Sequence, residues 1–578
     1  MSDKASARGR AELRAARGES RRLFAAIFLF SIFVNLLMLT GPIYMLQIYD
    51  RVLGSRSEET LVALTVLVAF LFLAMGLLDH SRSRIAARIG ARFQDRLDRR
   101  VFSASLRAMA VQPENTAAAA GQRDLEAIQR LLASPALMAL ADIPWTPLFI
   151  GAIFIFHPWL GLLALAGAAV LILTTILNQA FSAGPLQRAN MAAMHAERMA
   201  DQIKAEAEIV QSLGMRGAAF ARWQKARGAA LAATMRAGDL GGGFTATSKT
   251  FRLFLQSAIL GLGAYLVLQH ELTAGAMIAA SILLGRALAP IELAIGQWGL
   301  VQRAQEGWGR LAELLSRVPP EPTLTALPRP RAILEAQSLT VVPPGEQFAA
   351  LRMVSFRLEP GQAMGVIGPS GAGKSTLARA VTGVWHPAGG KVRLDGAALD
   401  QYDPDVLGSH IGHLPQRVTL FDGTIAENIA RLRGDADPEA VVEAAKKAAA
   451  HEMILQFPDG YDTRVSAIGG RLSGGQMQRI GLARAMYGNP VILVLDEPNS
   501  NLDNEGSAAL NIAIRQMKEA GKAVMIMAHR PAAIQECEVL LVLENGVRTA
   551  FGPRDTVLRD MVKNHTEIIR SAGPGGVS

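Results

Sequence analysis

Two short stretches in the second half of the chain carry side chains suited to handling phosphate. Residues 368–376 read GPSGAGKST, a glycine turn between an apolar run and an amphipathic one. Gly368, Gly371 and Gly373 would let backbone amides approach phosphate oxygens at the start of a helix, where the helix dipole also favours anions. The pattern predicts a phosphate-binding loop. Its members are Gly368, Pro369, Ser370, Gly371, Ala372, Gly373, Lys374, Ser375 and Thr376.

The second stretch, VILVLDEP at 491–498, is a continuous apolar run that ends in two carboxylates. A strand buried on both faces has this composition, as a central strand of a parallel sheet requires. We expect Asp496 to support Mg²⁺ and Glu497 to polarise an attacking water. Lys374 would reach the β- and γ-phosphates, and the Ser375 hydroxyl would hold the metal. ATP and Mg²⁺ are therefore the expected cofactors.

Two further side chains are candidates for the same site. The stretch AVMIMAHR at 523–530 is another buried strand, and His529 at its end could contact the γ-phosphate from a third direction. Gln416, in GHLPQRVTLFDGTIAENI, could sense the γ-phosphate or its metal. A structural histidine and an ordinary polar loop residue are the alternatives. We thus predict Glu497, His529 and Gln416 as catalytic residues, and Ser375, Gln416 and Asp496 as metal ligands.

The elements that position these residues fall into two regions. A chain of 578 residues exceeds one ordinary core, and its first 300 or so residues hold long apolar runs. Several runs reach the roughly 20 residues that cross a bilayer. They lie at 23–49, 60–78, 139–157, 159–178, 251–269 and 274–298. The prediction is an α-helical six-span transmembrane domain followed by an α/β P-loop nucleotide triphosphatase domain.

Composition shifts give the expected boundaries of these regions. A basic leader at 1–22 precedes a transmembrane domain at 23–317, and a proline-rich linker at 318–331 precedes a nucleotide-binding domain at 332–565. Residues 566–578 are expected to form a disordered tail. The lone Cys537 excludes an intramolecular disulfide framework.

The net charge of +9 raises the question of a nucleic-acid partner. Arginines that flank apolar spans explain the charge equally well, so we expect a membrane and no nucleic acid. Lys and Arg crowd the leader and the connections at 79–138 and 179–250, which places these sides and both termini in the cytoplasm. The alanine-rich connections should continue the helices beyond the membrane, with flexible loops as the alternative.

The sixth span contains two charged side chains, Arg286 and Glu292, which are costly against lipid. They should face a lumen or a partner helix, and a packing or snorkelling role is the alternative. Pro290 lies between them and should loosen the helix locally.

Several motifs in this order resemble those of the ATP-binding-cassette (ABC) ATPases: GPSGAGKST, LPQ, LSGGQ, VILVLDE, NLD and AHR. With six spans before them, the chain resembles a half-size ABC exporter over nearly its whole length. The resemblance implies that the LSGGQ loop covers nucleotide bound to the opposite subunit, so that the chain forms a homodimer. The residues it would bring to that shared site are Ser473, Gly474, Gly475, Gln476 and Asp503.

Longer stretches narrow the resemblance. GPIYMLQIYDRVLGSRSEETL, ADIPWTPLFI, GRALAPIELAIGQW and LPQRVTLFDGTIAENIARL are similar to the ATPases of type I secretion systems, especially those that export proteases. This implies an inner-membrane ATPase that exports an unfolded polypeptide with a C-terminal signal, together with a periplasmic adaptor and an outer-membrane channel. An exporter of lipid or small hydrophobic molecules, and a membrane ATPase regulator that transports nothing, remain alternatives.

One position departs from the family pattern. The family often has an aromatic residue that stacks on adenine just before the first turn of the cassette, and in TVVPPGEQF this position is Pro343. Either Phe348 substitutes for it or recognition of the base is loose.

Overall fold

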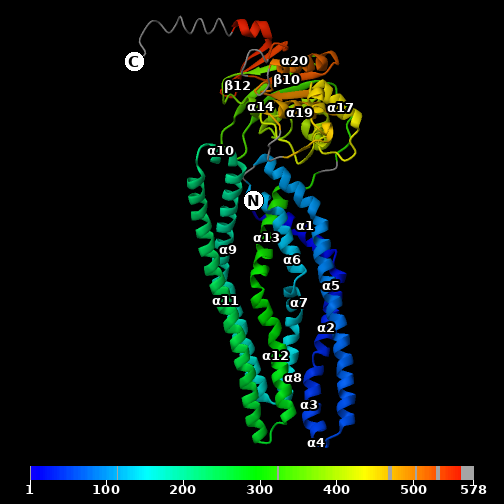
Figure 1. Cartoon of the computed structure of the whole chain (residues 1–578), viewed down its shortest axis with the longest axis vertical. Helices are drawn as coiled ribbons and strands as arrows, with labels where there is room; N and C mark the ends of the chain where they lie inside the picture. Colours follow the sequence, from blue (N-terminus) through cyan, green and yellow to red (C-terminus); the bar gives the residue numbers. More distant parts are fainter. Residues whose placement is uncertain are drawn as a thin grey trace, which may run out of the picture. The chain divides into compact units, whose positions relative to one another are not determined.

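The structure, a computed structural model, describes residues 2–112, 115–321, 324–466, 472–500, 504–528 and 534–560. The chain divides into two compact units, each described below by itself (Figure 1). The helical unit comprises residues 1–109 and 113–320, and the α/β unit comprises residues 110–112 and 321–578. The predicted tail at 566–578 lies outside the described residues.

The helical unit consists of α-helices joined by short connections. They are α1 (Ser2–Gly18), α2 (Arg21–Leu37), α3 (Thr40–Gln47), α4 (Leu53–Ser55), α5 (Glu58–Val111), α6 (Thr116–Leu132), α7 (Pro135–Asp142), α8 (Thr146–Phe156), α9 (Pro158–Ala205), α10 (Ala207–Ser212), α11 (Arg216–Leu268), α12 (Ala274–Gly296) and α13 (Trp298–Arg317).

Six helical stretches of the described residues are long and apolar enough to cross a membrane, which agrees with the predicted six spans. They run over Arg21–Ser55, Glu58–Val111, Pro135–Phe156, Pro158–Ala205, Arg216–Leu268 and Ala274–Gly296.

Three of these helices are much longer than a bilayer is thick. Helices α5, α9 and α11 have 54, 48 and 53 residues. At about 1.5 Å per residue each reaches roughly 70–80 Å, whereas the apolar layer of a bilayer is about 30 Å thick. The basic connections are therefore largely helical where they are described, and the alternative of two flexible loops is wrong. Helices α9 and α11 run side by side along most of their length (Figure 1).

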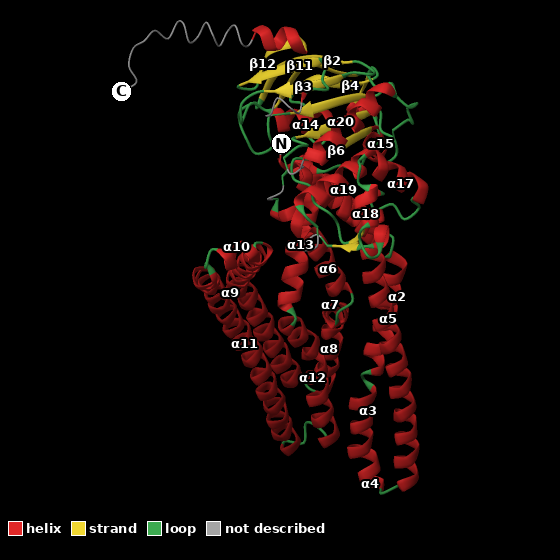
Figure 2. Ribbon diagram, turned by 45° about the horizontal axis from the view of Figure 1, so that its top comes forward, coloured by secondary structure: helices red, strands yellow, loops and turns green. Residues whose placement is uncertain are grey.

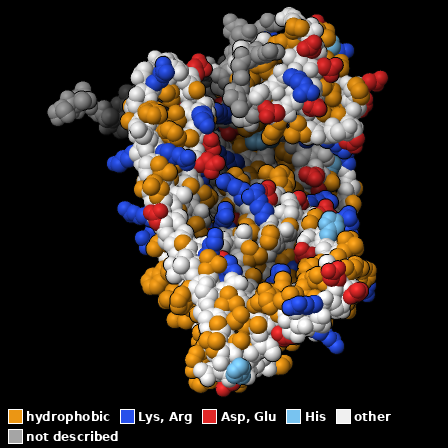
Figure 3. Space-filling model, turned by 60° about the horizontal axis from the view of Figure 1, so that its bottom comes forward, with side chains coloured by type: hydrophobic (Ala, Val, Ile, Leu, Met, Phe, Trp, Pro, Cys, Tyr) orange, Lys and Arg blue, Asp and Glu red, His pale blue; other side chains and the backbone are white. Residues whose placement is uncertain are grey.

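The outer surface of the spans is apolar. On α5, Val66, Phe70 and Leu73 are each about 65% exposed, at the spacing of one helix face. Figure 3 shows hydrophobic side chains gathered over the lower part of the helical unit, with Lys and Arg side chains above them. Large apolar patches of this kind mark a surface that lipid or a partner covers. Together with the six spans, they describe a multi-pass membrane protein.

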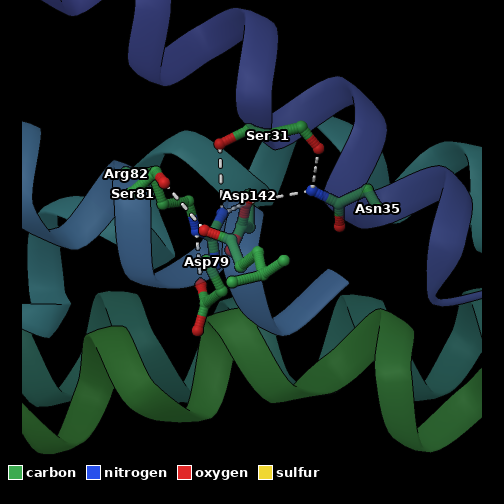
Figure 4. A network of polar contacts seen from close by, with 7 residues as sticks. Ser31, Asn35, Asp79, Ser81, Arg82 and Asp142 are labelled. Carbon is green, nitrogen blue, oxygen red and sulfur yellow. Dashed lines mark hydrogen bonds and ion pairs between the residues drawn. The ribbon is translucent and has the colours of Figure 1, made fainter. Parts of the chain in front are cut away.

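A buried polar network joins three helices of this unit (Figure 4). The Arg82 guanidinium of α5 lies 2.7 Å from the Asp142 carboxylate of α7 and 2.6 Å from Asp79 one turn earlier. Asn35 of α2 donates to Asp142 at 2.9 Å, and Arg82 also donates to the Ser31 hydroxyl at 3.1 Å. The Arg82 guanidinium thus has three acceptors, and removing Asp142 would leave this buried charge with weaker compensation.

The two charged residues of the sixth span have different surroundings. Glu292 of α12 forms an ion pair with Arg252 of α11, 2.5 Å apart, so it faces a partner helix as one of the two expectations has it. Arg286 is exposed and lines a cavity of about 430 Å³ together with Asp79, Arg82 and Asp142.

The described residues of the α/β unit form three sheets, the larger of which can be followed in Figure 2. The six-stranded sheet has the order β12-β11-β3-β10-β9-β6, and the four-stranded antiparallel sheet has the order β2-β1-β4-β5. A two-stranded ladder pairs β7 with β8. The strands are β1 (Leu334–Val341), β2 (Leu351–Leu358), β3 (Ala363–Ile367), β4 (Gly389–Leu394), β5 (Ala397–Ala398), β6 (Ile411–Leu414), β7 (Gly423–Thr424), β8 (Arg464–Val465), β9 (Ile492–Asp496), β10 (Ala523–Met527), β11 (Val539–Glu544) and β12 (Val547–Pro553).

The centre of the six-stranded sheet is parallel. Strand β10 pairs in parallel with β3 on one side and with β9 on the other, and every residue of β9 and β10 is buried. Helices on both faces explain why these strands read as unbroken apolar runs. The helices of this unit are α14 (Lys374–Val381), α15 (Pro404–His410), α16 (Ile425–Ile429), α17 (Pro438–Lys447), α18 (His451–Leu455), α19 (Gly474–Met486) and α20 (Asn504–Glu519).

Candidate functional site

The predicted site residues follow the carboxyl ends of neighbouring parallel strands. The glycine loop follows β3, Asp496 and Glu497 stand at the end of β9, and Gln416 comes two residues after β6. Because β3, β10, β9 and β6 lie in this order in the sheet, their carboxyl ends share one edge. Ligands of open α/β sheets bind at such an edge, so the sheet topology explains why residues far apart in sequence meet here.

The phosphate loop requires glycine at its two ends. A Cβ at Gly368 would come 2.1 Å from the carbonyl oxygen of Leu543, and a Cβ at Gly373 would come 2.6 Å from the Leu351 side chain. Gly373 also has φ = 98°, a backbone conformation that L side chains rarely adopt. The loop therefore makes a tight turn directly before α14. Backbone amides at such a helix N-terminus are suited to bind an anion.

Lys374 is the first residue of α14 and is buried. Its Nζ donates to the carbonyl oxygens of Gly368 and Pro369 at 2.8 and 2.9 Å, so the side chain folds back over the loop. Burial lowers the pKa of the Lys374 ammonium, while the nearby Glu497 and Asp496 carboxylates act in the opposite direction. The cation is thus held in the mouth of the loop, where a phosphate would replace the carbonyl acceptors.

Asp496 and Ser375 lie in contact, which brings the two predicted metal ligands together. The Asp496 carboxyl is buried at 6% exposure, and the Ser375 side chain is hydrogen-bonded to it. Burial raises the pKa of Asp496, and the hydrogen bond from Ser375 opposes this. The other oxygen, Asp496 Oδ1, is buried without a hydrogen-bond partner in the part of the chain that the structure describes.

An unpartnered carboxylate oxygen beside a hydroxyl fits a small hard cation. Mg²⁺ takes oxygen ligands and is usually bound by one or two carboxylates together with phosphate oxygens and water. Asp496 Oδ1 and Ser375 Oγ supply such oxygens, and Gln416 carries a third on its side-chain amide. The residues present therefore fit the predicted magnesium site.

Glu497 occupies a strained position. Its φ of 51° lies in the left-handed region, which is uncommon for a residue other than glycine. Its backbone N–H donates to the carbonyl oxygen of Met527, the last residue of β10, at 3.1 Å. Such outliers persist where the surrounding structure enforces them, and they cluster at functional sites. The strain turns the side chain of Glu497 away from the course of β9, towards the loop that carries Gln416.

Gln416 and Glu497 are in direct contact, which the sequence did not predict. The Gln416 Nε2 donates to Glu497 Oε2 at 3.0 Å. Since the amide nitrogen points to the carboxylate, the amide oxygen is the atom left to bind a cation. The two residues were predicted in separate roles, and the structure joins them in one arrangement.

The loop after Gln416 is pinned by a buried asparagine. Asn428 of α16 accepts a hydrogen bond from the Phe421 N–H at 2.8 Å and donates to the carbonyls of Phe421 and Thr424 at 2.9 and 3.0 Å. Its side chain is fully buried. The loop thus leaves the site along a fixed path towards α16 and α19, although Asn428 was not among the predicted residues.

The LSGGQ residues form the start of α19. The Ser473 hydroxyl accepts from the Gln476 N–H at 3.2 Å, and the Gln476 side chain accepts from the Ser473 N–H at 2.8 Å. This reciprocal cap orders the first turn and leaves the hydroxyl proton of Ser473 free to be donated outward. Ser473 and Gly474 are exposed, so this helix start can meet an anion from outside its own unit.

Sequence reasoning missed a link between α19 and the catalytic strand. Gln478 is buried, and its Nε2 donates to the carbonyl oxygen of Pro498 at 3.0 Å, next to Glu497. In the sequence, the only signal for this contact is the polar Gln478 two residues after LSGGQ, on a helix whose neighbouring residues are largely apolar. His529 and Asp503 lie outside the described residues, so their predicted roles remain predictions.

The loop that carries Phe348 runs past the phosphate loop. Ala350 and Leu351 lie within reach of a Cβ built on Gly373, and Phe348 two residues earlier is 83% exposed. An aromatic ring this exposed is available to stack on a base, and the substitution of Phe348 for the usual aromatic residue stays a prediction.

The fold and this site define a P-loop nucleotide triphosphatase joined to a six-span helical membrane unit. Comparison with known families agrees: the ABC transporter family matches residues 351–500, and the ABC transporter transmembrane region matches residues 24–288. The chain is 42% identical over 563 residues to the type I secretion system ATP-binding protein PrsD of Rhizobium meliloti, covering 97% of this chain and 96% of that protein.

A second relative is the cyclolysin secretion/processing ATP-binding protein CyaB of Bordetella pertussis, 30% identical over 93% of this chain and 76% of that protein. A solved bacterial Atm1-family ABC exporter with ATP bound superimposes with a TM-score of 0.80 over 96% of this chain and 99% of that one, at 24% identity. The chain belongs to the ABC transporter family, among the type I secretion ATP-binding proteins.

Proposed function

We propose that this chain is the ATP-hydrolysing permease of a type I secretion system, which drives an unfolded polypeptide out of the cytoplasm. The observation that carries the proposal is the Gln416–Glu497 hydrogen bond beside a complete phosphate loop, in a chain with a 42% identical type I secretion relative. The names of the relatives concern secretion and toxin translocation, which favours polypeptide over lipid or small hydrophobic cargo and over a non-transporting regulator.

The residues of this chain have distinct parts in ATP hydrolysis. The loop amides and Lys374 hold the β- and γ-phosphates, and for this the Lys374 ammonium exchanges its contacts with the Gly368 and Pro369 carbonyls for phosphate oxygens. Glu497 orients the attacking water and accepts charge from it, while Gln416 holds the carboxylate in place. His529 contacts the γ-phosphate from the end of β10.

Ser375, Asp496 and Gln416 hold Mg²⁺ in this proposal. When bound, Mg²⁺ neutralises charge on the phosphate oxygens. Ser375 and Asp496 are already in contact, and the buried Asp496 Oδ1 has no other partner among the described residues. A carboxylate this buried is costly unless a cation lies beside it.

Each site is completed by a second copy of the chain. Ser473, Gly474, Gly475, Gln476 and Asp503 of one subunit close over nucleotide on the phosphate loop of the other. The exposed, capped start of α19 supports this, since its hydroxyl and amides can approach an anion held elsewhere. Two-fold symmetry gives two equivalent sites, and ATP binding closes the dimer while hydrolysis releases it.

The membrane placement follows from charge. Basic residues before the first span and in the two long connections support a position in a bacterial inner membrane with both termini in the cytoplasm. A periplasmic adaptor and an outer-membrane channel would continue the path, and the cargo would carry a C-terminal signal. The long helices α5, α9 and α11 transmit the movement of the α/β units to the spans.

The proposal is tested by comparing the polypeptides released into the medium by cells with and without the gene. The deleted strain is complemented with wild type, Glu497→Gln or Glu439→Gln, the last being a matched change at an exposed glutamate of α17. We expect a defined set of polypeptides to disappear on deletion, to stay absent with Glu497→Gln and to return with Glu439→Gln. An unchanged set of secreted polypeptides, with altered export of a lipid or small hydrophobic molecule, would contradict the proposal.

A further inference from the structure

The first two helices form a cavity lined by arginines. The cavity has a volume of about 440 Å³, and its lining residues are Arg14, Arg17, Gly18, Arg21 and Phe24. Arg14, Arg17 and Gly18 belong to α1, and Arg21 and Phe24 belong to α2, so the cavity lies where the two helices join. No carboxylate of the described residues lines this cavity, which therefore has a strongly positive wall.

The acidic residues nearby are engaged elsewhere. Glu12 of α1 lies 2.8 Å from Arg100, and Glu19, just after α1, lies 3.0 Å from Arg96, both on α5. The buried Leu13 belongs to the same apolar cluster as Leu311 of α13. Helix α1 is thus held on two sides, by ion pairs and by apolar packing, and the arginines occupy the face that remains.

The three guanidinium groups of the cavity lack an anionic partner. Within the described residues, the guanidinium groups of Arg14, Arg17 and Arg21 form no hydrogen bond or ion pair, although each has five N–H donors. Arg17 is oriented by an aromatic ring: its Cζ lies 5.8 Å from the centroid of Trp308 of α13, and Trp308 stacks on Phe93 at 5.9 Å. The stacking holds the charge in place without neutralising it.

The cavity lies at the polar end of the first membrane span. Helix α2 begins at Arg21 and turns apolar at once, and Phe28, Leu29 and Phe33 on its outer surface are each about half exposed. These side chains face lipid in a membrane protein, which puts the arginines at the level of the head groups. Phe24 lines the cavity on the apolar side.

We propose that Arg14, Arg17 and Arg21 bind the phosphate-bearing head group of an anionic phospholipid, with Phe24 against the start of its acyl chains. Guanidinium groups offer paired N–H donors that match phosphate geometry. Three positive charges at the level of the head groups should favour an anionic lipid. A zwitterionic lipid should bind less well, because its own ammonium balances its phosphate. The site is separate from the nucleotide site and does not depend on which cargo the protein moves.

The test uses the purified full-length protein in detergent with added phosphatidylglycerol as the probe. A ligand that binds the folded state raises the unfolding midpoint with concentration, so the midpoint and the number of lipids retained in native mass spectrometry are both measured. We expect wild type to respond, and the variant with Arg14→Gln, Arg17→Gln and Arg21→Gln to lose at least tenfold in apparent affinity. Arg22→Gln removes a neighbouring exposed arginine outside the cavity and should respond like wild type.

Two further arms separate the sources of phosphate. Phosphatidylcholine should give little response at the same concentration, and inorganic phosphate should give none. An equal response to inorganic phosphate would show a site for soluble anions and overturn the proposal. An unchanged response of the triple variant would overturn it too. If the triple variant folds poorly, the single change Arg17→Lys, which keeps the charge but loses the paired donors, should still weaken lipid retention more than Arg22→Lys does.

Discussion

The side-chain amide of Gln416 donates to the carboxylate of Glu497, with 3.0 Å between Nε2 and Oε2. The partners lie 81 residues apart and come from the ends of β6 and β9, which are neighbours in the sheet. The bond fixes the carboxylate and at the same time orients the amide oxygen. A change in the loop after β6 that moves Gln416 therefore alters the contact that holds the group we expect to activate water.

Replacing Gln416 should lower turnover through Glu497. Gln416→Ala removes a hydrogen bond to a charged group, worth about 1.5–3 kcal/mol, so ATP hydrolysis should fall roughly tenfold or more. Gln416→Glu should be worse, because a second carboxylate would repel Glu497. Steady-state hydrolysis and ATP affinity measured for both variants provide the check. Equal activity of Gln416→Glu and wild type would show that the contact has no catalytic importance.

Glu497→Gln should keep ATP binding and lose most hydrolysis. The substitution preserves the shape of the side chain but removes the charge that positions water, so turnover should fall about a hundredfold or more. A loss of turnover without a loss of affinity indicates an interaction made in the transition state. Glu439→Gln serves as the matched control. Hydrolysis near the wild-type rate in purified Glu497→Gln would refute the assigned role.

Mixed dimers test whether each site is shared between two copies. A subunit with an inactivating substitution at Lys374 and a subunit with one at Ser473 should each be inactive as homodimers. In the mixed dimer, one site receives both defects, and the other joins an intact phosphate loop to an intact LSGGQ. That site should close over ATP and trap it. With random pairing about half of the dimers are mixed, so hydrolysis should reach at most roughly a quarter of wild type.

Two readouts are needed in the mixed-dimer experiment, because strict coupling between sites could suppress turnover. Nucleotide trapping in isolated mixed dimers should therefore be measured beside hydrolysis. If LSGGQ served its own chain, both sites would be defective. Neither trapping nor hydrolysis would then be restored, and the shared site would be ruled out.

Discrimination between ATP and GTP should be weak. By resemblance to the family, Pro343 is expected near the position of the usual adenine-stacking residue, and Phe348, at 83% exposure, is an aromatic residue five positions later. Since phosphate contacts cannot distinguish bases, the two affinities should differ by less than a hundredfold, or about 2.7 kcal/mol. Phe348→Ala should weaken both nucleotides alike if stacking operates. A larger preference for ATP would mean that another residue reads the base.

Arg286 should be accessible to water in at least one nucleotide state. A cysteine at 286, which faces the cavity of about 430 Å³, should label with a polar thiol reagent, whereas a cysteine at the buried Leu284 should not. Glu292→Cys should label more slowly, since Glu292 lies against Arg252. Cys537 can stay, because burial raises the pKa of its thiol to about 12. Complete protection of position 286 in every state would place it in helix packing.

The sequence predicted the fold class and the six spans because both depend on local patterns. Unbroken apolar runs with carboxylates or histidine at their ends identified β9 and β10, and length with apolar character identified the spans. The glycines at 368 and 373 identified the phosphate loop in the sequence. Glycine is required at both positions because a Cβ there would collide with neighbouring atoms.

Contacts between distant segments were not predictable in this way. The Gln416–Glu497 bond depends on the order of strands in the sheet, and the Gln478 bond to Pro498 depends on how α19 packs against it. In the sequence, Arg82 cannot be distinguished from the other arginines of the connection at 79–138. In the structure it is buried and paired with Asp79 and Asp142. Neither composition nor spacing states which partner a charge will meet.

Pro290 lies inside α12, the helix that also carries Arg286. A proline has no N–H, so the peptide carbonyl of residue 286, four positions earlier, lacks its usual helical partner. A helix with one such missing bond bends more readily there than along the rest of its length. The wall of the cavity therefore has a point of easier bending within one turn of its charged residue, and the peptide oxygen of that residue is left open to a hydrogen-bond donor other than the helix backbone.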